Sequence, residues 1–203
     1  MSAPLLPSLT LHLWGQHIAW ALVLAALTGC LLPSARAPIR RLCMAMVALA
    51  ACLPGPAGPV YWIALAYQMP SLTSVALALW WLRADVQGRR REPMPTSLWA
   101  VAAALGMVLL LDTLALLPWA PLYAWGFGPQ ALTGWMLLSA VLATQAKWRP
   151  LGWTGVQIGL VFAVTRLPTG NVWDAVIDPW LALLAIGVLV RRALRRSHTK
   201  PLV

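Results

Sequence analysis

Three charged side chains that could bind an anion or move a proton lie together in the stretch VTRLPTGNVWDAVIDPW, residues 164–180. Arg166 carries a planar guanidinium that suits phosphate or carboxylate groups, and Asp174 or Asp178 could act as a general base. Only 10% of the chain is charged, so this grouping is unusual within it. What these residues do depends on the elements that position them.

The composition is that of a protein whose solvent is the lipid bilayer. Hydrophobic residues make up 61% of the 203 residues and the mean hydropathy is +0.75, whereas a soluble domain usually has about 25% charged residues. Segments in lipid must be helices or closed barrels, because an unpaired backbone group is costly there. Runs such as IAWALVLAALTGCLL do not alternate as barrel strands do. We therefore expect an all-α integral membrane protein.

Seven apolar segments approach the length of about 20 residues that a transmembrane helix needs. The second and the seventh are short, so each crosses fully only if its helix extends beyond the apolar run. The expected spans are residues 12–32, 39–53, 60–82, 96–117, 131–146, 151–167 and 176–190. Together they form a single polytopic membrane domain, residues 1–203.

The basic residues set the expected orientation, because Lys and Arg collect in cytoplasmic loops. If the loops 33–41 and 83–95, the loop around Lys147 and the C-terminal tail are inside, fourteen of the fifteen Lys and Arg are cytoplasmic. The prediction is a seven-transmembrane-helix bundle, N-terminus out and C-terminus in, built as one helix plus three in-out-in hairpins. This topology accounts for the net charge of +10. No basic stretch alternates with aromatic residues, so we expect no nucleic acid as a partner.

The one basic residue left outside, Arg166, belongs to a predicted polar cluster at the periplasmic end of the bundle. Ionisable and polar groups from the ends of three predicted helices and from the last outer loop reach this depth. The members are Arg166, Asp112, Asp174, Asp178, Asn171, His12 and His17, with Gln16, Tyr61, Tyr123 and Gln130 nearby. Because intramembrane ionisable groups are often functional, this cluster is the candidate site.

Small residues give the predicted sixth helix one packed face. Gly152, Gly155 and Gly159 recur at helical spacing, and small residues four apart let a neighbouring helix approach closely. A membrane-protein partner or a second copy of the chain is one expected neighbour at this face. Arg166 follows the same face and needs a partner, for which Asp112 is the best candidate.

Two interpretations of the outer cluster remain open at this stage. In the first, an Arg166–Asp112 pair locks two helices, Asp178 caps the helix that begins at Pro179, and Asn171 caps a short helix. In the second, the same residues line an outward-facing pocket for a ligand, a proton or a partner's side chain.

A second polar group is predicted near the centre of the third span, in the sequence YQMPSLTS at residues 67–74. Pro70 must interrupt the helix and free a backbone carbonyl, which Gln68 or Ser71 could satisfy. Gln157 is expected at a similar depth and could reach Gln68. The break either lines a binding site, as in transporters, or is a kink satisfied by neighbouring hydroxyls.

No cofactor or metal is predicted. His12 and His17 are five residues apart, so they do not share a helix face, and the three cysteines lack metal-ligand spacing. No sequence motif of a nucleophilic enzyme or a zinc protease is present.

Three functions fit these features. The first is a non-catalytic accessory or assembly subunit of a membrane system. The second is a small transporter or ligand-binding membrane protein that uses the outer cluster. The third is a membrane enzyme for a lipid or lipid-linked substrate at the outer face, with Arg166 holding the anionic group. Short loops favour a bacterial inner membrane as the location.

Overall fold

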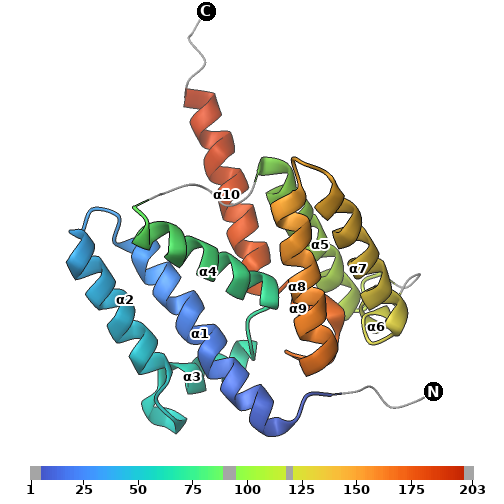
Figure 1. Cartoon of the computed structure of the whole chain (residues 1–203), viewed down its shortest axis with the longest axis horizontal. Helices are drawn as coiled ribbons and strands as arrows, with labels where there is room; N and C mark the ends of the chain where they lie inside the picture. Colours follow the sequence, from blue (N-terminus) through green and yellow to red (C-terminus); the bar gives the residue numbers. More distant parts are fainter. Residues whose placement is uncertain (1–5, 89–94, 118–120, 199–203) are drawn as a thin grey trace, which may run out of the picture.

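The computed structural model describes residues 6–88, 95–117 and 121–198, and within these ranges all regular structure is helical. Ten α-helices and one 3-10 helix form a bundle (Figure 1). They are α1 (Leu9–Leu31), α2 (Ala37–Ala51), η1 (Gly55–Ala57), α3 (Pro59–Tyr67), α4 (Leu72–Val86), α5 (Thr96–Thr113), α6 (Leu122–Trp125), α7 (Pro129–Thr144), α8 (Arg149–Thr165), α9 (Val172–Val176) and α10 (Pro179–His198).

Each of the seven predicted apolar segments overlaps mainly with one of these helices, except the third, which is divided between two, α3 and α4. Among the described residues, only α1 and α5 are long and apolar enough by themselves to cross a membrane. The other helices have fewer than 18 residues or, in α10, carry several arginines near the C-terminal end. The helical bundle is therefore confirmed, while the helices by themselves supply two candidate spans and not the seven expected.

The helices pack mainly as pairs, α1 with α2 and α4, α5 with α10, and α7 with α8. Figure 1 shows α1–α4 on one side, α5–α8 on the other, and α10 between them. Trp20 of α1 is buried in the first group against Ala51 and Val60. Trp99 of α5 is buried in the second, in a cluster that includes Leu181 of α10.

The glycine face of α8 is covered by α7 within the same chain. A Cβ atom on Gly152 would come within 2.1 Å of the backbone nitrogen of Ala143, and one on Gly155 within 2.4 Å of Ser139 Oγ. A Cβ on Gly159 would meet Met136. The face does allow close helix packing, as expected, but a partner or a second copy of the chain could reach it only by displacing α7.

The break between α3 and α4 falls where Pro70 predicts it. Helix α3 ends at Tyr67, Gln68 has a positive φ of 44°, and α4 begins after Ser71. The Ser71 side chain accepts a hydrogen bond from the backbone N–H of Ser74, which caps α4. The third apolar segment is thus two short helices joined by a compact, buried turn.

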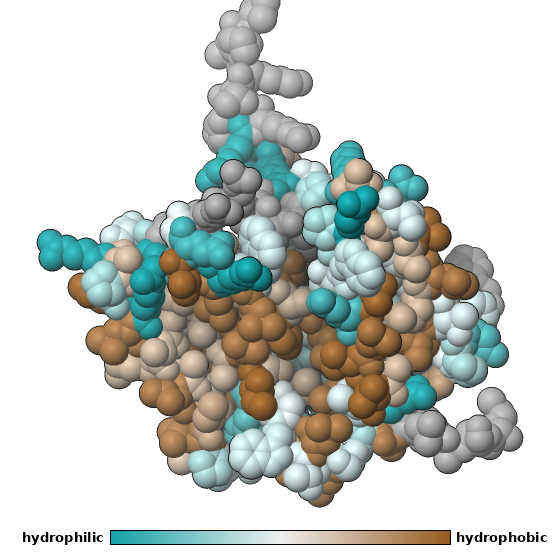
Figure 2. Space-filling view, in the orientation of Figure 1, coloured by the Kyte–Doolittle hydropathy of each residue, from teal (hydrophilic) through white to brown (hydrophobic). Residues whose placement is uncertain are grey.

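The surface divides into a hydrophilic end and a broad apolar band. Figure 1 shows the α1–α2 and α7–α8 turns and the C-terminal end of α10 toward the top of the view, with η1 and α6 toward the bottom. In the same view, Figure 2 shows hydrophilic side chains gathered at the top and hydrophobic ones forming a band below them. Large apolar side chains are well exposed on most helices, for example Leu49 at 70% and Val164 at 84%.

Candidate functional site

The segment after α8 folds through a dense set of hydrogen bonds with α6. Asn171 is fully buried; its side chain accepts from the backbone N–H of Trp173, capping α9, and donates to the carbonyl oxygen of Tyr123. The indole N–H of Trp173 donates to the carbonyl of Leu122. A Cβ on Gly126 would come within 1.8 Å of the Asn171 oxygen, so only glycine fits there. The predicted Asn171 cap is confirmed.

Asp174 and Tyr123 form the most perturbed titratable pair in this region. The Tyr123 hydroxyl donates to Asp174 Oδ2 at 2.7 Å, and the Thr169 hydroxyl donates to the same oxygen. Burial raises the pKa of the Asp174 carboxyl above its ordinary value, and the two donated hydrogen bonds oppose that rise. The pKa of Tyr123 is also raised, chiefly by burial and then by the neighbouring Asp174.

The predicted ion pair between Arg166 and Asp112 is not formed. Asp112 instead accepts the backbone N–H of Tyr123 at 2.7 Å and so fixes the start of α6. Arg166 ends α8 in the left-handed conformation, with its guanidinium 5.5 Å from the ring centre of Phe162. Within the described ranges, the ion pairs closer than 4 Å both involve Asp85. A left-handed residue turns the chain away from the helix axis, so the face of α8 does not predict where the Arg166 side chain lies.

Asp178 lies at the α3–α4 break, near enough to Asp174 for its charge to add to burial in raising the pKa of that carboxyl. Its Oδ2 accepts the Ser71 N–H and the Ser74 hydroxyl, each at 2.6 Å, and its Oδ1 accepts the Leu181 N–H at 2.7 Å. The carboxylate therefore joins the N-termini of α4 and α10, whose dipoles both favour negative charge there. The predicted Asp178 cap of α10 is confirmed, and its second role, as the acceptor for α4, was missed.

The carbonyl group exposed by the break is that of Gln68, and α1 satisfies it. Both the Gln16 amide, at 3.2 Å, and the Trp20 indole N–H, at 2.7 Å, donate to it. The Gln68 side chain is itself exposed, as is that of Gln157. Among the described residues no hydrogen bond joins Gln68 to Gln157, and the two donors from α1 bind the backbone carbonyl of Gln68.

The two histidines of α1 contact different neighbours, as their spacing predicts. His12 Nδ1 lies 3.0 Å from the carbonyl oxygen of Pro168, and His17 Nδ1 lies 2.9 Å from that of Ala51. A carbonyl can only accept, so each Nδ1 carries the hydrogen. His12 thereby joins α1 to the segment after α8, and His17 joins α1 to the end of α2.

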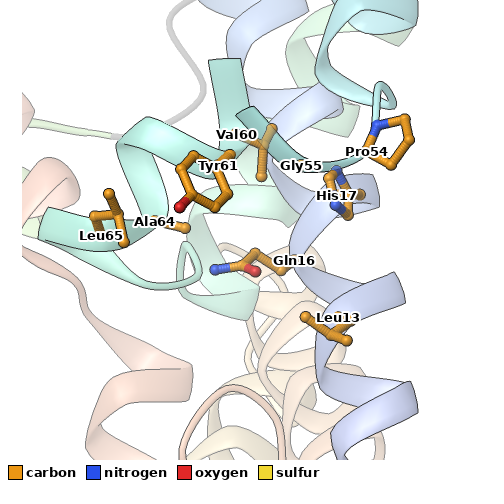
Figure 3. A pocket seen from close by; sticks show the side chains of 9 residues that line it. All are labelled: Leu13, Gln16, His17, Pro54, Gly55, Val60, Tyr61, Ala64 and Leu65. Carbon is orange, nitrogen blue, oxygen red and sulfur yellow. The ribbon is translucent and has the colours of Figure 1, made fainter. Parts of the chain in front are cut away.

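His17 also lines a hollow between α1, η1 and α3. The hollow has a volume of about 430 Å³ and its lining includes Gln16, His17 and Tyr61 with an apolar wall. Figure 3 shows these three side chains together with those of Leu13, Pro54, Val60, Ala64 and Leu65, and Gly55 completes the lining. The structure thus divides the predicted cluster. His17 reaches a cavity, whereas Asp112 holds α6 to α5, and Asp174 and Asn171 hold α6 to the segment that contains α9.

A buried ion pair at the opposite end was not predicted. Arg40 of α2 donates to Asp85 Oδ1 of α4 at 2.7 Å, with both residues at 5% exposure or less. Arg41 contacts the same carboxylate at 3.9 Å. In the sequence, Asp85 lies near several arginines and resembles an ordinary loop residue. Only the packing of α2 against α4 identifies its partner.

In the part of the chain that the structure describes, no three His, Cys, Asp or Glu side chains come together as metal ligands would. Comparisons with protein-family models, with curated proteins and with solved structures find no match to this chain.

Proposed function

We propose that the chain is a seven-span integral membrane protein, N-terminus out and C-terminus in, that acts as a non-catalytic accessory or assembly subunit. With its short loops, a bacterial inner membrane is the proposed location. Two features support the proposal: the exposed apolar surface of the bundle and the hydrogen bonds that its aspartates make.

The exposed apolar surface supports membrane embedding. In α5, only 17% of the most apolar 18-residue window is buried inside the bundle, and apolar side chains are exposed around most other helices as well. A soluble monomer rarely exposes contiguous apolar patches larger than a few hundred Å². Hydrophilic side chains at one end above an apolar band fit a cytoplasmic face that borders lipid (Figure 2).

The bundle gives seven crossings if the third and the seventh are each built from more than one segment of the chain. Helices α3 and α4 together cover residues 59–86 with one buried break, so they form one interrupted span. Helix α10 begins beside that break, because Asp178 binds Ser71, and residues 166–178 lead to it from the end of α8. Irregular backbone is tolerated at membrane depth where protein buries it.

The observation that supports the non-catalytic role is the set of hydrogen bonds that the carboxylates make. Asp112 binds a backbone N–H of α6, Asp174 binds two hydroxyls, and Asp178 binds two backbone N–H groups and a hydroxyl. Each of these groups holds one element to another, as expected of a scaffold.

Membrane topology can be tested by thiol labelling. In a variant with Cys30, Cys43 and Cys52 replaced by serine, a single cysteine is placed at Ala57 or at Ser34, both of which are exposed. An impermeant maleimide added to intact cells should label Ala57→Cys and spare Ser34→Cys until the cells are opened. The reverse pattern would overturn the orientation, and release of the protein by alkaline carbonate would overturn the membrane assignment.

The accessory role can be tested by purification in mild detergent from the native membrane after crosslinking. We expect a membrane protein partner in a fixed ratio that survives repeated chromatography. A chain that is always recovered alone, or whose Asp174→Asn variant loses a measurable activity on membrane lipids while staying folded, would contradict this role.

One observation favours a second function, ligand binding at the outer end. The hollow beside His17 is the part of the predicted cluster where polar atoms are left open (Figure 3), and its ligand can be argued from those atoms.

A further inference from the structure

Three polar side chains line the hollow between α1, η1 and α3, and contacts elsewhere fix the hydrogen-bonding roles of two of them, His17 and Gln16. We propose that this hollow binds an uncharged, lipid-soluble molecule whose head carries a hydroxyl group, as in a long-chain phenol. The inference deepens the second function above, ligand binding at the outer end, and names its site and ligand class.

His17 presents an acceptor to the ligand. Its Nδ1 lies 2.9 Å from the carbonyl oxygen of Ala51 and so must carry the hydrogen. In the neutral ring the other nitrogen, Nε2, then has a free lone pair. Among the described residues no partner occupies Nε2, and His17 is part of the cavity wall.

Gln16 presents a second acceptor for the same reason. Its amide NH₂ donates to the Gln68 carbonyl at 3.2 Å, which leaves the amide oxygen without a hydrogen bond to the described part of the chain. Gln16 is buried at 8% exposure and lines the hollow, so a ligand there can donate to this oxygen. Tyr61 adds a hydroxyl, which both donates and accepts, from the opposite wall on α3 (Figure 3).

The lining selects against ions and in favour of a donor. No Lys, Arg, Asp or Glu lines the hollow, so an anion or a cation would be desolvated without a counter-charge. Two acceptors and one hydroxyl instead suit a ligand hydroxyl that donates to His17 or Gln16 and accepts from Tyr61. This pattern also disfavours an ether or ester of the same shape, which has no hydrogen to give.

The remaining wall is suited to an alkyl chain or ring. Leu13, Val60, Ala64 and Leu65 line it, and the volume of about 430 Å³ falls within the range of about 300–1,000 Å³ that is usual for small-molecule sites. Tyr61 and Leu65 are both exposed, so the hollow opens at the bundle surface. In the proposed orientation that opening lies at the outer edge of the bilayer, where such molecules concentrate.

Photoaffinity labelling of the full chain in detergent micelles tests the site. The probe is a 4-alkylphenol with a diazirine in the alkyl chain, and labelled peptides are mapped by mass spectrometry. We expect labelling to concentrate on the peptides that contain residues 13–17 and 60–65. Excess 4-octylphenol should compete, and 4-octylanisole, which has the same shape without the donor hydrogen, should compete at least tenfold less well.

Two asparagine variants separate binding from folding. In His17→Asn the side-chain amide can still donate to the Ala51 carbonyl, as Nδ1 does, but the Nε2 acceptor is lost. His12→Asn makes the same change at a histidine that bonds to Pro168 and lies outside the hollow. We expect His17→Asn to weaken competition by 4-octylphenol about tenfold, the effect of one hydrogen bond, and His12→Asn to leave it unchanged.

Labelling spread evenly over all helices, equal competition by the phenol and its methyl ether, or equal effects of the two variants would each overturn the proposal. Thermal unfolding shows whether both variants remain folded. If His17→Asn does not fold, Tyr61→Phe provides a second test of the same site. The photoaffinity assay uses the purified chain in micelles. A negative result there would therefore not affect the thiol-labelling and crosslinking experiments, which test the topology and the accessory role.

Discussion

Asp178 shows how much one buried side chain contributes to this bundle. It accepts hydrogen bonds from Ser71, Ser74 and Leu181, so it both caps α10 and holds α4 in place. Asparagine has nearly the same shape but only one acceptor oxygen, and its NH₂ would oppose a backbone N–H. The substitution therefore loses at least one of the three hydrogen bonds and sets the new NH₂ against the N–H that made it.

We therefore expect Asp178→Asn to lower the free energy of unfolding by about 1–3 kcal/mol, which corresponds to several degrees in Tm for a chain of this size. Thermal unfolding in detergent, followed by circular dichroism, measures this. Thr133→Ala is the matched control, because Thr133 is exposed and bonds only to its own helix. Equal Tm values for the two variants would show that Asp178 does not stabilise the contact between α4 and α10.

At Asp174 the prediction concerns pH. Burial raises the pKa of this carboxyl in the folded chain, so the folded state binds the proton more tightly than the unfolded state does. The stabilising contribution is complete below the unfolded pKa, about 4, and is lost as pH rises through the raised folded value. Asp174→Asn cannot lose a proton, so its stability relative to wild type should increase from pH 4 to pH 8. Unfolding midpoints that run parallel across this range would contradict the prediction.

Among the elements, the α7–α8 pair depends most directly on glycine. A Cβ on Gly152 meets the backbone of Ala143, whereas one on Gly134 of α7 meets nothing within 4 Å. Gly152→Ala should therefore push the helices apart and destabilise the chain by about 1–3 kcal/mol. Gly134→Ala should be neutral or stabilise by up to about 1 kcal/mol, because alanine favours the helix. Unfolding of the two variants side by side checks this difference in sign.

The turn between α3 and α4 gives a second pair with opposite signs. Gln68 has φ 44°, a backbone conformation in which glycine is less strained than glutamine, and its side chain is exposed. Gln68→Gly should raise the free energy of unfolding by about 0.5–1 kcal/mol. Gln157→Gly, at an exposed position inside α8, should lower it by about 1 kcal/mol. A loss of stability in both variants would show that the Gln68 side chain contributes contacts of its own.

At the scale of elements, the sequence predicts what depends on neighbouring residues and fails where distant residues meet. The caps at Asn171 and Asp178 and the break at Pro70 are local signals, since a few residues determine each. The bond from Trp20 to the Gln68 carbonyl and the buried pair of Arg40 with Asp85 join residues more than 40 positions apart. Nothing in either local sequence specifies the other partner. Helix periodicity predicts the wrong partner for Arg166, because α8 ends one residue before it, at Thr165.

For the whole molecule, helix length sets the preferred bilayer. Helices α2, α7 and α8 have 15, 16 and 17 residues, or about 22–26 Å at 1.5 Å per residue, less than the hydrocarbon thickness of about 30 Å in a typical membrane. In the proposed membrane orientation, such short helices favour thin bilayers. We expect the highest Tm in phosphatidylcholine vesicles with short acyl chains and a steady fall as the chains lengthen. A maximum in the thickest bilayers would argue against these helices as spans.

The carboxylate shared by α4 and α10 also bears on how the protein is made. In the proposed membrane orientation, the apolar part of α10, residues 179–190, covers only about 18 Å, too little to enter lipid from the translocon unaided. Helix α10 emerges from the ribosome after α4, so Ser71 and Ser74 have been made before Asp178 needs them. Insertion of α10 should then depend on α4, and substitutions at Ser71 should reduce the yield of the chain in the membrane.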